Sequence, residues 1–225
     1  MNKLGIIGAG IMGTDLAQMT AEAGFTVKIF DIDERKSLNA LNTIISRLAD
    51  YLEKKRINEG DSERVRASIS IVTDMSELED ADMVLESVFE DLNLKKEIFH
   101  ELDEVCRPGT VLASNTSSIS ITEIASVTNR PESVIGLHFL NPARVLPLVE
   151  IVPGFLTTRE TVEMAKSFLK KMKKDFVEAK DYPGFYLNRI LYPMINEAVF
   201  LLYEGGAKPE IIDKTIKKGL NLHMG

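Results

Sequence analysis

The sequence predicts an α/β protein in which a doubly wound, mostly parallel sheet precedes an all-helical region. Over the first two-thirds of the 225 residues, short apolar runs alternate with stretches of helical periodicity. That alternation is typical of a parallel sheet covered by helices on both faces. A glycine-rich turn joins the first apolar run to the first helical stretch, and only helical periodicity remains after Pro183-Gly184. These three observations carry the fold prediction.

Apolar runs define the expected strands, and apolar side chains spaced by three and four residues define the expected helices. Strands are expected at residues 4–7, 26–30, 69–72, 83–87, 110–113, 134–137, 148–152 and 176–179. Helices are expected at residues 11–23, 34–56, 92–105, 119–127, 159–172, 187–202 and 209–218. Ser120 or Thr122 is a candidate N-cap for the helix at 119–127, and Pro209 suits the start of the last helix. Crossover connections should be right-handed.

The change of pattern at Pro183 predicts a domain boundary. Residues 1–183 are expected to form the α/β domain, and residues 184–225 the start of a helical domain. A segment of about forty residues is too short to bury a good core of its own. The second domain is therefore expected to be partial.

Composition and charge exclude several classes of protein. Apolar residues make up 44% and charged residues 27%, as in ordinary globular chains and unlike disordered or fibrous ones. The net charge of −7 would repel nucleic acid and anionic membranes, so neither is an expected partner. No run reaches the ~18 apolar residues of a membrane span, and no targeting segment is recognisable. Cys106 is the single cysteine, which excludes an intrachain disulfide and a cysteine-rich metal site, and a reducing cytoplasm is the expected location.

A dinucleotide-binding fingerprint joins the first strand to the first helix: Gly8-Ala9-Gly10-Ile11-Met12-Gly13. Gly8 permits the tight turn, Gly10 lets the backbone approach a pyrophosphate, and Gly13 lets the helix pack closely on the strand. The free N–H groups and positive dipole of the helix that starts at Ile11 and Met12 attract the phosphates. The pattern predicts a Rossmann-type domain.

An acidic residue, Asp31, ends the second expected strand. A carboxylate there accepts hydrogen bonds from the adenosine ribose and repels a 2′-phosphate, so NAD is favoured over NADP. Arg35 and Lys36 keep NADP as a lesser alternative. A glycine turn in an α/β domain that binds no nucleotide is the other alternative.

His138 and Glu150 are a candidate acid–base pair. His138 lies where the expected strand 134–137 ends, and ligands of open α/β sheets bind outside the carboxyl ends of the strands. A histidine there can take a proton near neutral pH. Glu150 lies in the next apolar run, where it could fix the imidazole tautomer and stabilise its protonated form. The alternatives are a histidine satisfied in the core or a loop, and a glutamate on an exposed strand face.

A run of short polar side chains follows the expected strand 110–113: Ser114-Asn115-Thr116-Ser117-Ser118. Such groups could donate to a substrate oxygen and to the nicotinamide ribose. The alternative is that they begin a helix. Asn188 lies within an apolar helix although asparagine is a poor helix former, so it either faces solvent or makes a specific hydrogen bond.

Together these residues resemble the L-3-hydroxyacyl-CoA dehydrogenase family, which includes bacterial 3-hydroxybutyryl-CoA dehydrogenases. The similarity covers essentially the whole chain, in family order. Its blocks are the glycine fingerprint, Glu86-Ser87-Val88-Phe89-Glu90-Asp91, the Ser114–Ser118 run, Gly136-Leu137-His138-Phe139-Leu140-Asn141-Pro142, Pro147-Leu148-Val149-Glu150 and Asp181-Tyr182-Pro183-Gly184-Phe185-Tyr186-Leu187-Asn188-Arg189.

The resemblance implies NAD-dependent oxidation of an (S)-3-hydroxyacyl-CoA to a 3-oxoacyl-CoA, or the reverse reduction. In that reaction His138 would be the general base and Glu150 would support its positive charge. Ser117 and Asn188 would hydrogen-bond the reacting oxygen of the substrate, a CoA thioester. Contacts to the nicotinamide half of NAD would come from Glu90, Lys95, Ser117 and Asn141, and the CoA phosphates would meet Lys54 or Lys55. A homodimer through the C-terminal helices is also implied.

The sequence departs from the family pattern at three places. Leu140 replaces a common phenylalanine, and Ala143-Arg144-Val145 stands where apolar residues are frequent. Family members also continue with further helices beyond the point that His223-Met224-Gly225 occupies here. Two other functions therefore stay open: a dehydrogenase of a free 3-hydroxy acid of the gulonate or carnitine kind, and an NAD-binding protein without catalysis.

Overall fold

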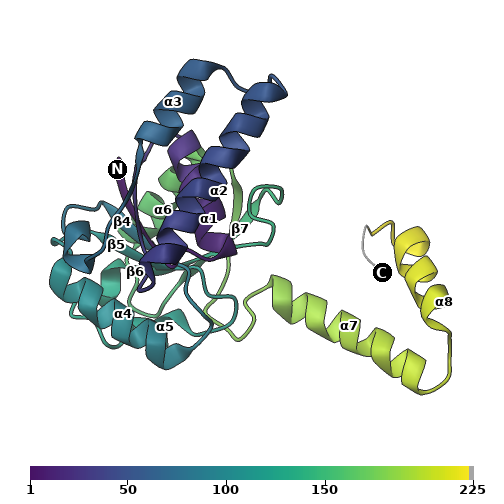
Figure 1. The fold of residues 1–225 in the computed structure, drawn as a ribbon. Coiled ribbons are helices and arrows are strands. Elements are labelled where there is room, and N and C mark those ends of the chain that lie inside the picture. The colour runs from purple at the N-terminus through teal and green to yellow at the C-terminus, as the bar shows by residue number, and fades with distance from the viewer. Residues whose placement is uncertain (223–225) are drawn as a thin grey trace. The chain divides into compact units, whose positions relative to one another are not determined.

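The strands of this protein form one twisted sheet in the order β3-β2-β1-β4-β5-β6-β7-β8 (Figure 1). The computed structural model describes residues 1–222, so His223-Met224-Gly225 lie outside the described residues. The strands are β1 (Lys3–Ile7), β2 (Thr26–Phe30), β3 (Ile69–Ile71), β4 (Met83–Glu86), β5 (Val111–Ser114), β6 (Val134–Phe139), β7 (Leu148–Pro153) and β8 (Asp175–Glu178). The first six in this spatial order pair in parallel, β7 runs antiparallel to β6, and β8 runs parallel to β7. The mostly parallel sheet is confirmed.

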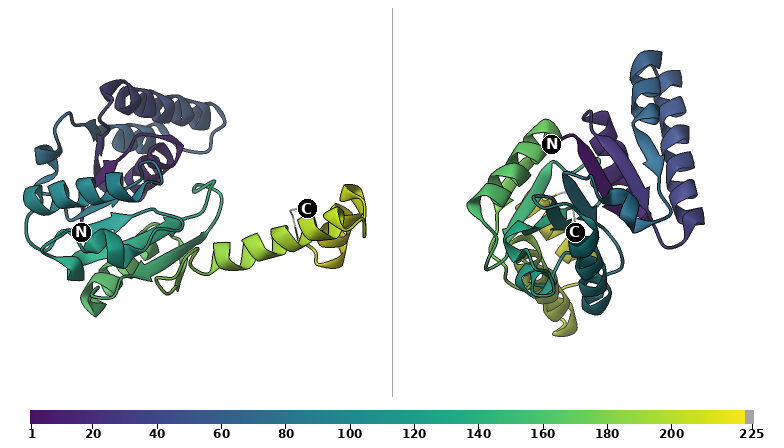
Figure 2. Two further views of the ribbon diagram at one scale, coloured as in Figure 1. Left: turned by 90° about the horizontal axis from the view of Figure 1, so that it is seen from below. Right: turned by 90° about the vertical axis from the view of Figure 1, so that its left-hand side faces the viewer.

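Helices cover both faces of the sheet, as expected (Figures 1 and 2). One face packs against α1 (Ile11–Glu22), α2 (Glu34–Glu53), α3 (Glu59–Ala67) and α6 (Arg159–Lys171), through a core that includes Leu16, Ile44 and Phe168. The other face packs against α4 (Leu92–Val105) and α5 (Ile121–Ala125), through Phe99, Ile121 and their neighbours. In both layers the helices predicted from the sequence turn their apolar side chains toward the sheet.

Most expected elements are present within a residue or two, and the three clearest differences in the first 185 residues are as follows. The helix expected at 34–56 ends at Glu53, and Lys55 takes a positive φ of 53°. Helix α3 was not predicted, because Val65 is its one buried residue and no apolar periodicity marks it. The helix expected at 119–127 contracts to α5, whose N-cap is Ser120 and not Thr122.

The chain divides into two compact units, Met1–Phe185 and Tyr186–Gly225. The first unit contains the whole sheet. The second contains α7 (Leu187–Tyr203), α8 (Pro209–Lys214) and a short π-helical turn (Thr215–Gly219), where the sequence predicted one helix to Lys218. Several apolar side chains of α7 are exposed, among them Ile190 at 69% and Val199 at 57%. None of the helices in residues 1–222 has the length and apolar character needed to cross a membrane.

Candidate active site

The turn between β1 and α1 is built for close approach of a ligand to the backbone. Gly8 has a positive φ of 92°, and a Cβ on it would lie 2.6 Å from the Ser87 carbonyl oxygen. A Cβ on Gly13 would lie 1.8 Å from the Gly8 carbonyl oxygen, so only glycine fits there. A Cβ on Gly10 would meet nothing within 4 Å. The turn is therefore closely packed against the protein at Gly8 and Gly13, and its side at Gly10 is open.

The N-terminus of α1 has the features of a phosphate site. Its N-cap, Gly10, provides no side-chain cap, and its first turn holds no acidic residue. The first backbone N–H groups of a helix, here those of Ile11, Met12 and Gly13, lack intrahelical acceptors. Free donors and the positive end of the helix dipole favour an anion at this point. The residues present thus fit the pyrophosphate of a dinucleotide.

Asp31 follows β2 and is half-buried beside this turn. Its Oδ2 accepts a hydrogen bond from the Ala9 N–H at 2.8 Å, and its Oδ1 accepts one from the Asp33 N–H at 3.0 Å. The two cations that kept NADP open have other partners. Arg35 donates to both carboxylate oxygens of Asp33, and the Lys36 ammonium lies 5.5 Å from the centre of the Phe89 ring.

His138 and Glu150 form a hydrogen-bonded pair across two adjacent strands. The antiparallel register of β6 and β7 sets them directly opposite each other, and His138 Nδ1 lies 2.8 Å from Glu150 Oε2. Both side chains are buried, with 8% of the histidine and 1% of the glutamate side chain exposed. The alternative of an exposed Glu150 is therefore wrong. The Phe185 ring packs near the imidazole, with the two ring centres 5.7 Å apart.

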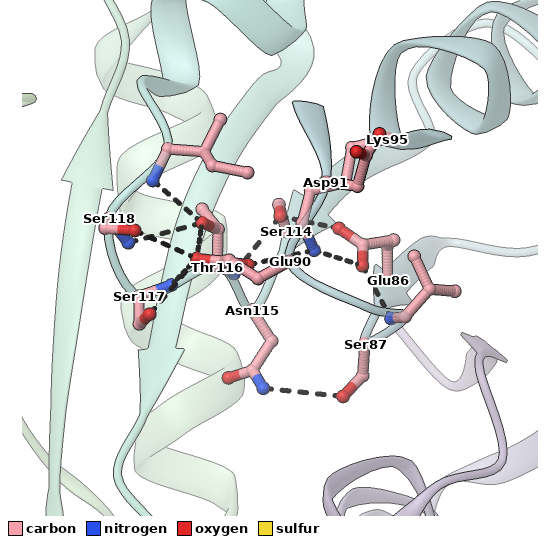
Figure 3. A network of polar contacts seen from close by, with 12 residues as sticks. Glu86, Ser87, Glu90, Asp91, Lys95, Ser114, Asn115, Thr116, Ser117 and Ser118 are labelled. Carbon is pink, nitrogen blue, oxygen red and sulfur yellow. Dashed lines mark hydrogen bonds and ion pairs between the residues drawn. The ribbon is translucent and has the colours of Figure 1, made fainter. Parts of the chain in front are cut away.

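The polar run after β5 meets the segment after β4, and Glu90 is the acceptor between them (Figure 3). Glu90 Oε1 accepts hydrogen bonds from Thr116 Oγ1 at 2.6 Å, from the Ser117 N–H at 2.8 Å and from Ser117 Oγ at 3.1 Å. Burial raises the pKa of Glu90, but these donors and the Lys95 charge outweigh it, so the net pKa is lowered. Glu90 is held as a carboxylate.

Two members of the polar run make hydrogen bonds inside the protein. Ser114 belongs to β5 and is fully buried, and its Oγ donates to Glu86 Oε2 at 2.6 Å. Asn115 Oδ1 accepts from the Phe139 N–H at 2.9 Å, which ties the run to the end of β6 beside His138. The expectation that the whole run supplies ligand donors is therefore wrong for Ser114, whose hydroxyl is buried against Glu86. Thr116 Oγ1 and the Ser117 hydroxyl both face Glu90.

The Lys95 side chain is buried and does not lie on the protein surface. Its side chain is 1% exposed, and its ammonium lies 2.6 Å from Glu86 Oε1 and 3.4 Å from Glu90 Oε2. Asn141 is exposed in the loop after β6. Lys54 caps α2 and pairs with Asp50 at 2.7 Å on the protein surface. Asn188 is buried at the start of α7 and belongs to the second unit.

Sequence reasoning missed the roles of two carboxylates, Glu86 beside the site and Asp181 at the start of α5. Glu86 appeared only within a matching block, although a glutamate ending a fully apolar strand is a signal for a buried partner. Asp181 accepts hydrogen bonds at the start of α5 from the N–H groups of Ile121 and Thr122, both within 2.9 Å. No spacing rule links Asp181 to a helix sixty residues earlier in the chain. The described residues contain no group of three or more His, Cys, Asp or Glu that could hold a metal ion.

The chain matches the two domain profiles of one enzyme family. The profile described as "3-hydroxyacyl-CoA dehydrogenase, NAD binding domain" matches residues 3–182, and "3-hydroxyacyl-CoA dehydrogenase, C-terminal domain" matches residues 184–225. A probable 3-hydroxybutyryl-CoA dehydrogenase of Bacillus subtilis is 45% identical over 100% of this chain and 78% of its own length. A 3-hydroxybutyryl-CoA dehydrogenase of Bradyrhizobium diazoefficiens is 41% identical over 100% of this chain and 77% of its own.

Solved structures give the same result. The crystal structure of a (S)-3-hydroxybutyryl-CoA dehydrogenase from Ralstonia eutropha superposes with a TM-score of 0.97 at 39% identity. This match covers 100% of this chain and 80% of that one. The fold and the glycine turn define the class, an NAD-dependent oxidoreductase that acts on a CH–OH group. The chain belongs to the 3-hydroxyacyl-CoA dehydrogenase family, and the prediction of NAD as its cofactor is confirmed.

Proposed function

We propose that this chain interconverts a short-chain (S)-3-hydroxyacyl-CoA and the corresponding 3-oxoacyl-CoA, with His138 as the general base. The buried hydrogen bond between His138 Nδ1 and Glu150 Oε2 carries the proposal, because it orients a titratable ring at the carboxyl edge of a dinucleotide-binding sheet. The relatives named as 3-hydroxybutyryl-CoA dehydrogenases support a four-carbon acyl group.

The pair determines which imidazole nitrogen exchanges a proton with the substrate. A carboxylate can only accept, so the Nδ1–H group donates the hydrogen bond to Glu150 and Nε2 presents a lone pair. During oxidation Nε2 takes the proton of the 3-hydroxyl group, and during reduction it returns that proton. Glu150 stabilises the imidazolium formed in between. Because Glu150 is buried, solvent screens this attraction little.

The cofactor would lie along the carboxyl edge of the sheet. Gly8, Gly10, Ile11, Met12 and Gly13 would hold its pyrophosphate through their backbone, and Asp31 its adenosine ribose. Bound NAD supplies the hydride acceptor for C3 of the substrate. Its nicotinamide half would be held by Glu90, Lys95, Ser117 and Asn141.

Ser117 and Asn188 would hydrogen-bond the reacting oxygen, and Lys54 would meet the CoA phosphates. In this proposal residues 1–183 are the NAD-binding domain and residues 184–225 the start of the substrate-binding domain.

The exposed apolar side chains of α7 support a homodimer formed through the C-terminal helices. We place the protein in the cytoplasm.

The test is consumption of NADH with acetoacetyl-CoA, together with NADH binding measured by fluorescence. Turnover with the CoA ester, and little with free acetoacetate or with NADPH, is the expected result. Turnover of free acetoacetate alone would replace the proposal with the dehydrogenase of a free 3-hydroxy acid. Binding of NADH without any turnover would leave an NAD-binding chain without catalysis.

The base assignment has its own test. His138→Gln should lower kcat by ~10²–10⁴-fold and leave NADH affinity little changed, because general-base catalysis contributes that much to the chemical step. His100→Gln is the matched control, since His100 lies exposed on α4. Equal kcat in the wild type and His138→Gln would remove His138 from the mechanism.

A further inference from the structure

A buried ion pair lies beneath the candidate cofactor side of the site. Glu86, the last residue of β4, is fully buried, and Lys95 in α4 is 1% exposed. Removing both charges from water costs several kcal/mol per ion, and an apolar pair of similar size is often as stable. Stability alone therefore does not explain why the protein has this ion pair. Its role is better inferred from the groups that Glu86 and Lys95 contact.

The Glu86 carboxylate accepts hydrogen bonds from donors in three different segments. Its Oε1 accepts from the Val88 N–H at 2.7 Å and from Lys95 Nζ at 2.6 Å, and its Oε2 accepts from Ser114 Oγ at 2.6 Å. One side chain thus joins the turn after β4, the helix α4 and the end of β5 (Figure 3).

These contacts close into a ring. Ser114 Oγ accepts from the Thr116 N–H at 3.2 Å, Thr116 Oγ1 donates to Glu90 Oε1 at 2.6 Å, and Lys95 lies 3.4 Å from Glu90 Oε2. The ring runs from Glu86 through Ser114, Thr116, Glu90 and Lys95 back to Glu86. It contains two carboxylates and one ammonium, so Lys95 is shared between Glu86 below and Glu90 at the surface.

The ring lies where the second half of a dinucleotide belongs. A dinucleotide crosses the carboxyl edge of such a sheet, with its adenosine half on the β1–β2 side. Its other half must then reach the turns after β4 and β5, which are the two turns that the ring joins. Groups that meet a ligand need placement within about 0.5 Å, which a supporting layer of buried contacts provides.

We propose that Glu86 is a positioning residue for NAD binding, which acts by dividing the Lys95 charge and so fixing the Glu90 carboxylate against Thr116 and Ser117. This inference rests on the proposed function, because that proposal places Glu90 and Ser117 at the cofactor. Without the Glu86 charge, the Lys95 ammonium would draw Glu90 toward itself. Glu90 would then give up hydrogen bonds to the turn after β5, and that turn would shift.

The experiment compares Glu86→Gln with Asp103→Asn in the full chain. Asp103 is a matched control because its carboxylate is also buried and also accepts from three donors, Arg130 Nε, the Asn129 N–H and Asn129 Nδ2, near the opposite end of α4. Both variants should lower the Tm of the protein without cofactor. Glu86→Gln alone should raise the NADH Kd about tenfold and lower kcat, since a misplacement of 1 Å can cost ~10²-fold.

The result that overturns the inference is a Glu86→Gln protein that loses Tm as Asp103→Asn does while its NADH Kd and kcat match the wild type. If Glu86→Gln does not fold, Glu86→Asp decides, because it keeps the buried charge but withdraws the carboxylate by one methylene group from Lys95 and Ser114. Its NADH Kd should rise several-fold, and an unchanged Kd would again overturn the inference.

The two proposals fail in distinguishable ways. The Glu86 inference is read from the ratio of NADH Kd values, so it can hold for a chain that binds NADH and does not turn over acetoacetyl-CoA. If the wild type turns over acetoacetyl-CoA and the NADH Kd is unchanged in both Glu86→Gln and Asp103→Asn, the proposed function stands and the Glu86 inference is overturned. A wild-type chain that binds no NADH would overturn both.

Discussion

Two glycines of the β1–α1 turn should respond differently to alanine. Gly13→Ala should both destabilise the protein and abolish NADH binding, because its Cβ would lie 1.8 Å from the Gly8 carbonyl oxygen. Gly10→Ala meets no protein atom within 4 Å, so its free energy of unfolding should change by no more than ~1 kcal/mol, the size of an N-cap effect. Its NADH Kd should nevertheless rise, since the new methyl group occupies the open side of the turn.

Urea unfolding and NADH fluorescence of the two variants measure both effects. Wild-type NADH affinity in Gly10→Ala would show that the pyrophosphate does not approach this backbone. A Gly13→Ala protein as stable as the wild type would contradict the close packing of α1 on β1.

Residue by residue, the sequence predicted the groups that follow chemical rules and missed those that depend on three-dimensional contacts. His138 and Glu150 could be paired because a short loop joins their strands and each charge needed a partner. The fate of Lys95 could not be predicted, because a lysine on an amphipathic helix is ordinarily solvated and only the packed structure brings Glu86 beneath it. Ser114 was expected to donate to a ligand, but it is buried and supports Glu86, because β5 ends one residue later than expected.

At the scale of elements, α5 depends on a residue that is remote in the chain. A helix of five residues is too short to be stable by itself. Asp181 accepts from the N–H groups of Ile121 and Thr122 and from the Ser120 and Thr122 hydroxyls, all within 2.9 Å. It therefore fastens the end of the first unit to the start of α5.

Asp181→Asn should lower the free energy of unfolding by about 1–2 kcal/mol, because the amide nitrogen cannot accept and either the Ile121 or the Thr122 N–H then loses its acceptor. Urea unfolding measures the change. Asp175→Asn is the control, since it removes the same charge from an exposed position in β8. Equal stability of the two variants would show that Asp181 does not hold α5.

The elements that were predicted best are those whose apolar pattern matches burial. The bounds of β2 and α4 agree with the prediction at both ends, and each buries a regular set of side chains. Two of the misjudged elements bury little: α3 has one buried residue, and the end of α2 beyond Leu48 has none. Their boundaries are set by caps and local charges, which apolar periodicity does not record.

At the scale of the whole molecule, the two edges of the sheet differ in the kind of residues they carry. The carboxyl edge holds the glycine turn, the Glu90 cluster and the His138–Glu150 pair. The opposite edge holds ion pairs that join neighbouring strands and loops, including Asp80 with Lys3 and Lys28 and Asp103 with Arg130. Changes at this second edge should therefore alter stability and leave cofactor binding unchanged.

The pH dependence of stability should show the contribution of Asp80. Hydrogen bonds from Lys3 and Lys28 lower the pKa of its carboxyl from 3.8 to about 2 and outweigh the effect of burial. Between these two pH values the unfolded chain binds a proton that the folded protein does not, so stability rises with pH there. The contribution of Asp80 is fully present above pH ~4 and is lost as the pH falls through about 2.

Asp80→Asn should accordingly be less stable than the wild type at pH 6, and the difference should shrink as the pH falls from about 4 to about 2. Urea unfolding at closely spaced pH values measures both curves. Since Asp80 lies at the edge away from the glycine turn, NADH affinity at pH 7 should be equal in the two proteins. Parallel stability curves would show that the ion pairs of Asp80 contribute nothing to the folded state, as many exposed pairs do.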